Sequence, residues 1–353
     1  MTRQQMAYLA CTAAVVAAGL GAAPPTDHPT VHRVSPGESI QKAVNTAKPG
    51  DAIVLSPGTY HESVRITVPG LTLRGWSARS TVIVPGPSSA DSTCAKAGHG
   101  ICVTGKDSSP VTDVTVRSLT LRGFAKNGLW ASGTDRLTVR QVTSENNGQW
   151  GFAQEQSVRG VFRDNVAQGN GDAGLFLANT VIAEQGARDT KGAVVRHNRL
   201  LGNRIGLTVR RLRNLAVDHN EATGNCVGVF VVGDENRPLP GALSVRHNYI
   251  HDNNKYCAKT ARLPFLQGSG IVLTGTEDTL VAHNRVEDNR GKSPLSGGIV
   301  LFKNFKGAPN QRIEIRDNVV QRNGTADLAN RDTGKGNGFH GNACAVSQPA
   351  GMC

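Results

Sequence analysis

The most regular feature of the chain is a pair of asparagines five residues apart, flanked by short runs in which apolar and polar residues alternate. Six segments carry the pair: RDNVAQGN (163–170), RHNRLLGN (196–203), DHNEATGN (218–225), RHNYIHDN (246–253), AHNRVEDN (282–289) and RDNVVQRN (316–323). A run of glycine and apolar residues follows most of these pairs, as in GLTV at 206–209. Because alternation with a period of two is typical of strands, we predict short strands on both sides of each pair.

The spacing of the pairs indicates the architecture. The shortest interval between corresponding asparagines is about 22 residues, and the longer intervals contain insertions. A fixed period of this size indicates a solenoid. Leucine-rich repeats share the period but need a denser leucine pattern than this sequence has. The pattern therefore predicts an all-β fold, a single-stranded parallel β-helix of about nine to ten coils that stack roughly 4.8 Å apart.

The paired asparagines are expected to occupy the corners of the coils. Asparagine tolerates the left-handed backbone of a sharp turn, and its amide can donate and accept hydrogen bonds along a stack. We expect the first members to form one internal ladder: Asn165, Asn198, Asn220, Asn248, Asn284 and Asn318. The second members should mark the next corner: Asn170, Asn203, Asn225, Asn253, Asn289 and Asn323.

The beginning of the chain predicts export. Residues 1–23 contain one early arginine, then an apolar run rich in alanine and valine, then small residues, which is typical of a secretory signal peptide. The apolar run is short for a membrane span, and no other segment is suited to cross a membrane. We interpret residues 24–33 as a flexible lead-in and 34–353 as one secreted β-helix domain.

Both ends of that domain should be covered. Residues 38–48 predict an amphipathic helix that closes the first coil, with one apolar face made by Ile40, Ala43, Val44 and Ala47. Six cysteines lie after the leader, an even number that predicts disulfides in an exported chain. We expect Cys94–Cys102, Cys226–Cys257 and Cys344–Cys353, the last of which would pin a C-terminal cap near 325–353.

Charge bears on the partner more than on the fold. Lysine and arginine total 39 and aspartate and glutamate 27, a formal net charge of +12. A basic surface favours an anionic partner, and a basic surface with no specific partner is the alternative. We expect an acidic polysaccharide and a monomeric protein, with no nucleic acid partner.

One stretch carries a family resemblance. The run SIQKAVNTAKPGDAIVLSPGTYHESVRIT, followed by LTLRG at 71–75 and the repeats, resembles the secreted right-handed parallel β-helix proteins of the pectin-lyase-like group. That group includes polysaccharide lyases, uronan epimerases, glycoside hydrolases and a periplasmic family linked to copper delivery. The Asp-Pro-His-Asp run of the epimerases and the Arg-x-Pro-x-x-Arg run of pectate lyases do not occur here. The resemblance therefore implies a right-handed helix and leaves the activity open.

The resemblance also implies that ligands lie along the strands that follow the second corner. Alternation makes two outward columns there, of which the first contains Trp130, Phe176 and Phe230. Exposed aromatic side chains between long insertions would form a sugar-binding groove, and the alternative is a satellite core under those insertions. Further candidate substrate-binding residues on this face are Glu155, Arg210, Arg211 and Phe302.

Candidate catalytic groups are fewer. A lyase needs a cation for the uronate carboxylate and a base for the α-proton, and Arg210 and Lys259 are the candidates. Glu235 and Glu277 fall at equal offsets on adjacent predicted coils, so they could form an acid/base pair, or a Ca²⁺ site with neighbouring aspartates. The alternative, which we favour, is a surface ion ladder of little energetic value.

A histidine column precedes the first ladder, made by His197, His219, His247 and His283. Stacked imidazoles could bind Cu²⁺ or Zn²⁺, which is the alternative function of a metal-handling protein. The position also accepts aspartate, as a polar residue beside a turn would, so we favour a structural role and predict no resident metal. A non-catalytic surface or adhesion module is the remaining alternative to a polysaccharide-processing protein.

Overall fold

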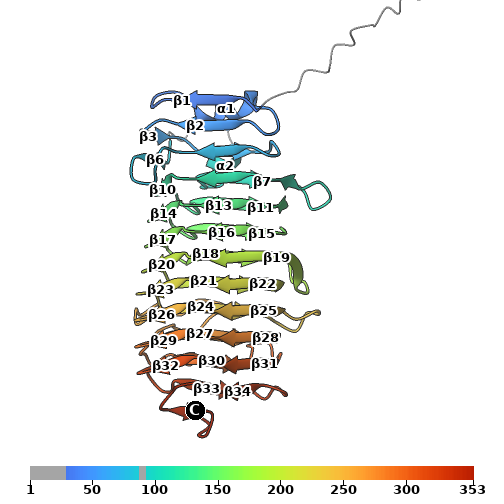
Figure 1. Cartoon of the computed structure of the whole chain (residues 1–353), viewed down its shortest axis with the longest axis vertical. Coiled ribbons are helices and arrows are strands. Elements are labelled where there is room, and N and C mark those ends of the chain that lie inside the picture. Colours follow the sequence, from blue (N-terminus) through green and yellow to red (C-terminus); the bar gives the residue numbers. More distant parts are fainter. Residues whose placement is uncertain (1–28, 87–92) are drawn as a thin grey trace, which may run out of the picture.

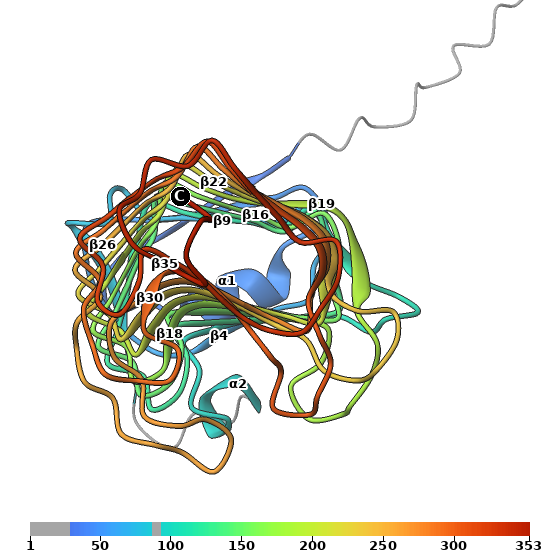
Figure 2. The same ribbon diagram turned by 90° about the horizontal axis from the view of Figure 1, so that it is seen from below.

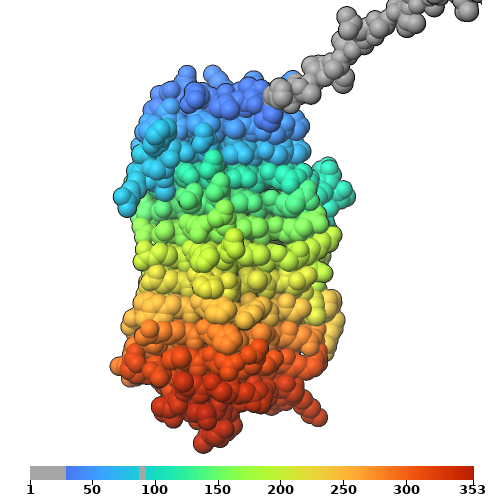
Figure 3. All heavy atoms as spheres, viewed as in Figure 1, coloured from blue at the N-terminus to red at the C-terminus, as the bar shows by residue number. Residues whose placement is uncertain are grey.

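The computed structural model describes residues 29–86 and 93–353, which wind into one right-handed parallel β-helix (Figure 1). Each coil passes through three sheets, named A, B and C in chain order, and neighbouring strands within each sheet come from adjacent coils and pair in parallel. In the space-filling view the coils form bands that follow the order of the chain (Figure 3). The predicted signal peptide lies outside the described residues.

The three sheets run the length of the molecule. Sheet A contains β1 (Val31–Val34), β2 (Ala52–Leu55), β5 (Thr72–Arg74), β9 (Thr115–Arg117), β13 (Thr138–Arg140), β16 (Val161–Arg163), β19 (Arg188–Arg196), β22 (Leu212–Asp218), β25 (Gly241–Arg246), β28 (Glu277–Ala282), β31 (Gln311–Arg316) and β34 (Gly338–His340). Sheet B contains β3 (Gly58–His61), β6 (Thr81–Val84), β10 (Thr120–Arg122), β14 (Thr143–Glu145), β17 (Val166–Gln168), β20 (Arg199–Leu201), β23 (Glu221–Thr223), β26 (Tyr249–His251), β29 (Arg285–Glu287) and β32 (Val319–Gln321). Sheet C contains β4 (Val64–Ile66), β7 (Ile101–Thr104), β11 (Leu129–Ser132), β15 (Phe152–Glu155), β18 (Ala173–Ala178), β21 (Ile205–Arg210), β24 (Val227–Val232), β27 (Ser269–Thr274), β30 (Gly297–Phe302), β33 (Leu328–Arg331) and β35 (Ser347–Gln348). A small separate sheet pairs β8 (Val111–Thr112) with β12 (Thr134–Asp135).

Both asparagine ladders form as predicted. The backbone N–H and the side-chain amide of Asn198 donate to Oδ1 of Asn220 at 3.0 and 2.9 Å, and the amide also donates to the carbonyl of Phe162 at 2.9 Å. The second corner repeats this arrangement, since Asn203 donates to Asn225 in the same way. Each buried amide is therefore satisfied by the coils on either side.

The left-handed turn residue is not the asparagine, which corrects the expectation. The residue before it adopts that conformation, with φ of 53° at His197 and 54° at His219, and 65° at Gly202 at the second corner. This division has a physical reason: the asparagine must point inward to reach its neighbours, so the preceding outward residue makes the turn. The repeated histidines thus have a structural role at the corner.

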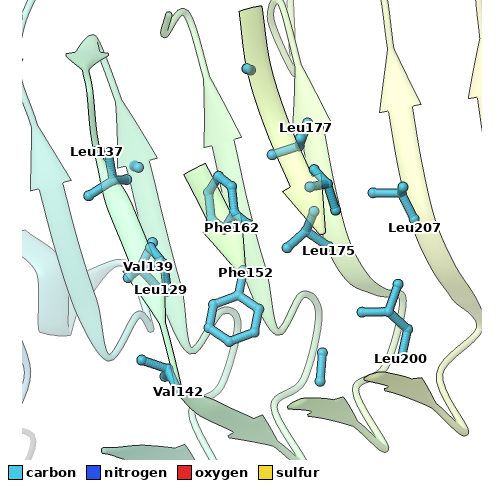
Figure 4. Close-up of a cluster of buried hydrophobic side chains, with 14 of the residues drawn as sticks. Leu129, Leu137, Val139, Val142, Phe152, Phe162, Leu175, Leu177, Leu200 and Leu207 are labelled. Carbon is cyan, nitrogen blue, oxygen red and sulfur yellow. The ribbon is translucent and has the colours of Figure 1, made fainter. Parts of the chain in front are cut away.

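The main core fills the interior of the helix. Leu, Ile, Val and a few Phe side chains alternate inward from all three sheets, as Leu129, Phe152, Leu175 and Leu207 do on sheet C (Figure 4). The predicted N-terminal cap is confirmed, because α1 (Ile40–Thr46) covers the open first coil with Ile40 and Val44 buried. The cap residue Ser39 accepts a hydrogen bond from the N–H of Lys42.

A second apolar cluster lies outside the helix, on the outer face of sheet C. It contains Trp150, Phe176, Phe230 and Leu266. The ring of Trp150 stacks on Phe176 with centroids 4.1 Å apart. Leu266 comes from the segment after β26, which folds back onto the sheet and is tied to it by the disulfide Cys226–Cys257. The insertions thus act as a satellite core over this part of the sheet.

All three predicted disulfides are present. Their Cα atoms lie 5.8 Å apart in Cys94–Cys102, 6.1 Å in Cys226–Cys257 and 5.2 Å in Cys344–Cys353, within the range a disulfide needs. The first ties α2 (Thr93–Lys96) to β7, and the last closes the C-terminal segment. Within the described part of the chain, neither helix has the length and apolar character of a membrane span.

Replacing Asn220 by Ala should lower the free energy of unfolding by about 1–3 kcal/mol, because the buried backbone N–H of Asn198 then loses its acceptor and the Asn198 amide and Asn248 Oδ1 each lose one partner. Asn220→Leu should cost less, since Leu119 and Val142 fill the same corner in earlier coils. Urea unfolding followed by circular dichroism measures the difference. Asn45→Ala, on the exposed side of α1, is the control, and equal stabilities for it and Asn220→Ala would contradict the internal ladder.

Replacing Phe176 by Ala should lower the free energy of unfolding by about 3–5 kcal/mol, the usual cost of removing a buried phenylalanine. Its side chain is 8% exposed beneath Trp150. Phe305→Ala is the matched control, because Phe305 is 52% exposed and should tolerate the change. A wild-type melting temperature for Phe176→Ala would show that the outer cluster adds no stability.

Candidate functional site

The outward columns of sheet C have the predicted register. Trp130, Ala153, Phe176, Thr208 and Phe230 face one another on successive strands of the sheet. Phe176 and Phe230 are 8% and 1% exposed, however, so they do not offer a surface on which a sugar ring could stack. The expected role of these two side chains is therefore wrong, because the covering segments and the neighbouring rings bury them.

Trp130 lies at the edge of this buried cluster. Its ring stacks between His99 and Trp150, with centroids 5.5 and 6.1 Å away, and it keeps part of its surface exposed. Burial, and then Lys126, lower the pKa of His99 to about 4, so this imidazole is neutral at pH 7. Sequence reasoning missed Trp150 and His99, although each stands close before an apolar strand of sheet C.

The second outward column is more open and more polar. Glu155 and Arg210 occupy it on β15 and β21, on either side of the small side chain of Ala178. The loop after β18 holds both, because the N–H of Val181 donates to Glu155 at 3.1 Å and the carbonyl of Val181 accepts from Arg210 at 3.1 Å. Ser132 donates to the other oxygen of Glu155 at 3.3 Å. The sequence placed these two residues correctly on one face but could not show the backbone that joins them.

The two adjacent arginines of β21 differ in their partners. Arg211 is 3% exposed, forms an ion pair with Asp234 and donates to the carbonyl of Ala183 at 2.7 Å, so it is not available to a ligand. Arg210 is half-buried, and none of the described carboxylates lies within ion-pair distance of it. Burial lowers the pKa of the Arg210 guanidinium, and Arg211 and Arg262 lower it further.

The segment from Lys255 to Gln267 forms one side of this face, and the loops that lead from sheet C to sheet A form the other (Figure 2). Tyr256 and Lys259 are exposed on that segment, and Tyr256 stacks on Phe265 with centroids 5.8 Å apart. Arg262 is exposed there too and close enough to affect Arg210. Farther along the column, the ring of half-buried Phe302 lies beside that of exposed Phe305, with centroids 5.7 Å apart.

The predicted pair of Glu235 and Glu277 does not form. In the sheet, the residue opposite Glu277 is Gly241, and Glu235 lies in the insertion before β25, so equal sequence offsets do not give equal positions. Glu277 instead binds Arg213 at 2.5 Å and Arg312 at 3.2 Å. The contact between Glu277 and Arg213 passes over Gly241, where a Cβ atom would lie 2.9 Å from Glu277 Cγ and 3.1 Å from Arg213 Nη1.

The calcium alternative is not supported either. Asp234 forms its ion pair with Arg211, and Asp278 binds Arg312 at 2.6 Å, so arginines already neutralise both carboxylates. Asp278 carries a lowered pKa mainly because of that hydrogen bond from Arg312. Glu277, Asp278, Arg213 and Arg312 thus form a network of ion pairs, as the favoured interpretation expected, whereas the pair of Asp234 and Arg211 is buried.

The histidine column stacks as predicted. Ring centroids lie 5.2 Å apart for His197 and His219, 4.8 Å for His219 and His247, and 5.4 Å for His247 and His283. Asp218 joins the central two, since its oxygens lie 2.7 Å from Nδ1 of His219 and 3.0 Å from Nδ1 of His247. Over residues 29–86 and 93–353, Asp218, His219 and His247 are the only group of three or more His, Cys, Asp or Glu side chains whose potential metal-ligand atoms all lie within 4.8 Å of one another.

Three solved structures share this architecture at low sequence identity. The A-module of a mannuronan C-5 epimerase from Azotobacter vinelandii is 18% identical over 87% of this chain and 90% of its own, with a TM-score of 0.61. A family 28 exopolygalacturonase from Yersinia enterocolitica is 12% identical over 91% and 75%, with a TM-score of 0.58. A DFA-IIIase from Arthrobacter chlorophenolicus is 12% identical over 87% and 91%, with a TM-score of 0.55.

These similarities concern the fold. No curated protein sequence matches the chain significantly. The family model described as the right-handed beta helix region matches residues 87–239 and 240–350, which is more than half of the chain. Together with the observed coils, this match shows that the chain belongs to the right-handed β-helix family.

Proposed function

We propose that this protein binds an acidic polysaccharide across the outer face of sheet C, with Arg210 as the anchor for a uronate carboxylate. The observation that carries the proposal is the environment of Arg210. Its guanidinium is half-buried, held by the carbonyl of Val181, and without a carboxylate partner among the described residues, while its neighbour Arg211 is fully engaged with Asp234.

A half-buried guanidinium of this kind is incompletely satisfied. Arginine presents five N–H donors, and the hydrogen bonds that the structure records for Arg210 use one of its nitrogens. A planar carboxylate is the group that matches the remaining donors, because it can accept two parallel hydrogen bonds. Lys259 and Arg262 on the neighbouring segment would add to the attraction for an anionic chain.

The charge of the chain, its structural neighbours and its disulfides agree with this ligand class. The chain carries a formal charge of +12, which favours polyanions. Two of the structural neighbours have names that refer to uronic acid polymers, mannuronan and polygalacturonate. Three disulfides support the proposal that the protein works outside the reducing cytoplasm, where such polymers occur.

Glu155 gives the same face an acceptor. Its carboxylate takes hydrogen bonds from Ser132 and Val181, and it stands opposite Arg210 across Ala178. A sugar chain that placed a carboxylate on Arg210 could place a hydroxyl of a neighbouring ring near Glu155. Half-buried Trp130 and Phe302 and exposed Tyr256 and Phe305 are aromatic surfaces that this face still offers for stacking, in place of Phe176 and Phe230.

Arg210→Gln should weaken the binding of a short oligouronate by about 10- to 100-fold, because one charge-assisted hydrogen bond is worth about 1.5–3 kcal/mol. Isothermal titration calorimetry measures the change. Arg199→Gln is the matched control: it removes the same charge from sheet B, where Arg199 pairs with Glu221. Unchanged affinity in Arg210→Gln, with both variants folded, would remove Arg210 as the anchor.

Catalysis requires its own measurement. A lyase breaks the glycosidic bond by β-elimination and leaves an unsaturated uronate, which absorbs ultraviolet light. Incubation of the protein with polymannuronate, polyguluronate and polygalacturonate would show this absorbance for a lyase and leave it flat for a binding module. Binding without any product would favour the non-catalytic surface module.

A second function, metal binding at the histidine column, is favoured by the position of Asp218. A carboxylate only accepts hydrogen bonds, so Nδ1 of both His219 and His247 must carry the hydrogen. Burial raises the pKa of the Asp218 carboxyl, but the hydrogen bonds from these two histidines outweigh it and hold that pKa below its ordinary value. The Nε2 lone pairs of two half-exposed imidazoles are therefore free for Zn²⁺ or Cu²⁺, with Asp218 orienting the rings.

His247→Asn should weaken Zn²⁺ or Cu²⁺ binding by about tenfold or more, as loss of one ligand does. Asparagine is chosen because it tolerates the positive φ of 53° at this corner. His61→Asn is the control, because His61 is an exposed histidine on sheet B, outside the column. Equal metal affinity in both variants would exclude the column as a metal site.

A further inference from the structure

Five arginines lie directly above one another on the outer face of sheet A. Arg74 on β5 pairs with Arg117 on β9, which pairs with Arg140 on β13, then Arg163 on β16 and Arg196 on β19. They occupy five consecutive strands of the sheet without interruption. Because parallel strands lie about 4.8 Å apart, the five guanidinium stems span about 19 Å along the molecule. We call this column the arginine ladder.

The charge of the arginine ladder is largely uncompensated. Arg163 binds Asp164 at 2.8 Å, and no other carboxylate in the described residues lies within ion-pair distance of the five side chains. Burial lowers the pKa of Arg117, and the adjacent Arg140 and Arg74 lower it further, as expected for like charges held side by side. Like charges opposite one another destabilise a sheet, so this column works against stability unless an anion lies on it.

A flat lane runs beside the ladder. Two residues before each arginine, the outward positions carry small β-branched side chains, all of them half-exposed: Thr72, Thr115, Thr138, Val161 and Val194. No described segment lies over this part of the outer face of sheet A, whereas the loops and α2 gather around sheet C and at the corners (Figure 2). The ladder therefore borders an open strip that a linear chain could follow.

We propose that the arginine ladder is a binding site for a linear polyanion that carries one carboxylate on each sugar, in other words a polyuronate chain lying parallel to the helix axis. The spacing of the cations is set by the coil repeat, which is comparable with the length of one pyranose ring in a chain. Guanidinium groups bind carboxylates in a planar, two-point manner, and the flat Thr/Val lane leaves room for the rings beside them.

This site is distinct from the one at Arg210. It lies on another sheet, so a chain on the ladder does not cross Glu155 or Arg210. Its function follows from its open and repetitive form: it would hold a long polymer against the protein through many weak contacts, without reaching any one sugar closely. The inference does not depend on the proposed role of sheet C, and each can fail alone.

The test is a double variant, Arg117→Gln with Arg140→Gln, which removes two adjacent unpaired members of the ladder. Binding to polyuronates of increasing length is measured by calorimetry at low and moderate salt. Affinity of the wild type should rise with chain length up to the span of the ladder. The double variant should lose about tenfold in affinity for long chains, and free galacturonate at equal carboxylate concentration should not compete.

The matched control is Arg285→Gln with Arg322→Gln, which removes the same charge from cations that Glu287 already pairs. An equal loss of affinity in the control would overturn the proposal, because net charge alone would then explain binding. Single-stranded DNA that bound the ladder as tightly as a polyuronate would also overturn it. A double variant that keeps the wild-type affinity and length dependence would refute the ladder, whatever Arg210→Gln does to the binding of short oligouronates.

Discussion

The hydrogen bond from one buried asparagine amide to the next is the interaction on which the rest of this structure depends. Each amide donates both to the asparagine of the following coil and to a backbone carbonyl of the preceding one, as Asn198 does toward Asn220 and Phe162. A slip of one residue between coils would leave these buried groups unpaired and reverse the inward and outward faces. The ladders therefore fix the register of all three sheets.

Because the register is fixed, residues at the same outward position of successive coils lie above one another and form a column along the sheet. On sheet A the column of Arg74, Arg117, Arg140, Arg163 and Arg196 continues into Asp218 on the next strand. That single change of sign alters the chemistry of the surface within one coil. Before it the column presents the cations of the proposed polyanion site. At Asp218 it presents a carboxylate that contacts Nδ1 of His219 and His247, the residues of the proposed metal site.

Sheet C shows how the segments between coils decide which columns reach solvent. Its first outward column is apolar, and the segment that carries Leu266 covers it together with Trp150. The second column is less covered. There the backbone of Val181 donates a hydrogen bond to Glu155 and accepts one from Arg210, which holds both side chains in place. The proposed polysaccharide site on this sheet therefore rests on a half-buried guanidinium and not on a row of aromatic rings. Over the arginine ladder of sheet A, by contrast, no described segment forms such a cover (Figure 2).

The repeat in the sequence was sufficient to predict the coils, both asparagine ladders, the capping helix and the three disulfides. Each of these follows from local periodicity or from stacking by whole coils, because equal positions in a regular repeat must lie above one another. The same reasoning placed Arg210 and Glu155 on one face and the histidines in one column. The sequence also contains a repeated Thr/Val-x-Arg pattern, but periodicity did not identify its arginines as a column, which became evident only from the pairing of consecutive strands.

Tertiary structure decided what the insertions do. Equal offsets from a glycine did not place Glu235 beside Glu277, because residues before β25 leave the regular coil and Gly241 takes that position. Alternation correctly predicted that Phe176 and Phe230 point away from the helix interior. An outward side chain is exposed to solvent, however, only where no other segment packs on the sheet. Leu266, which packs in the outer cluster, and Asp234, the partner of Arg211, both lie in insertions that have no repeat. So does Val181, which accepts from Arg210, a residue that no described carboxylate reaches. Periodicity determines which way a side chain points, and packing between irregular segments determines what it meets there.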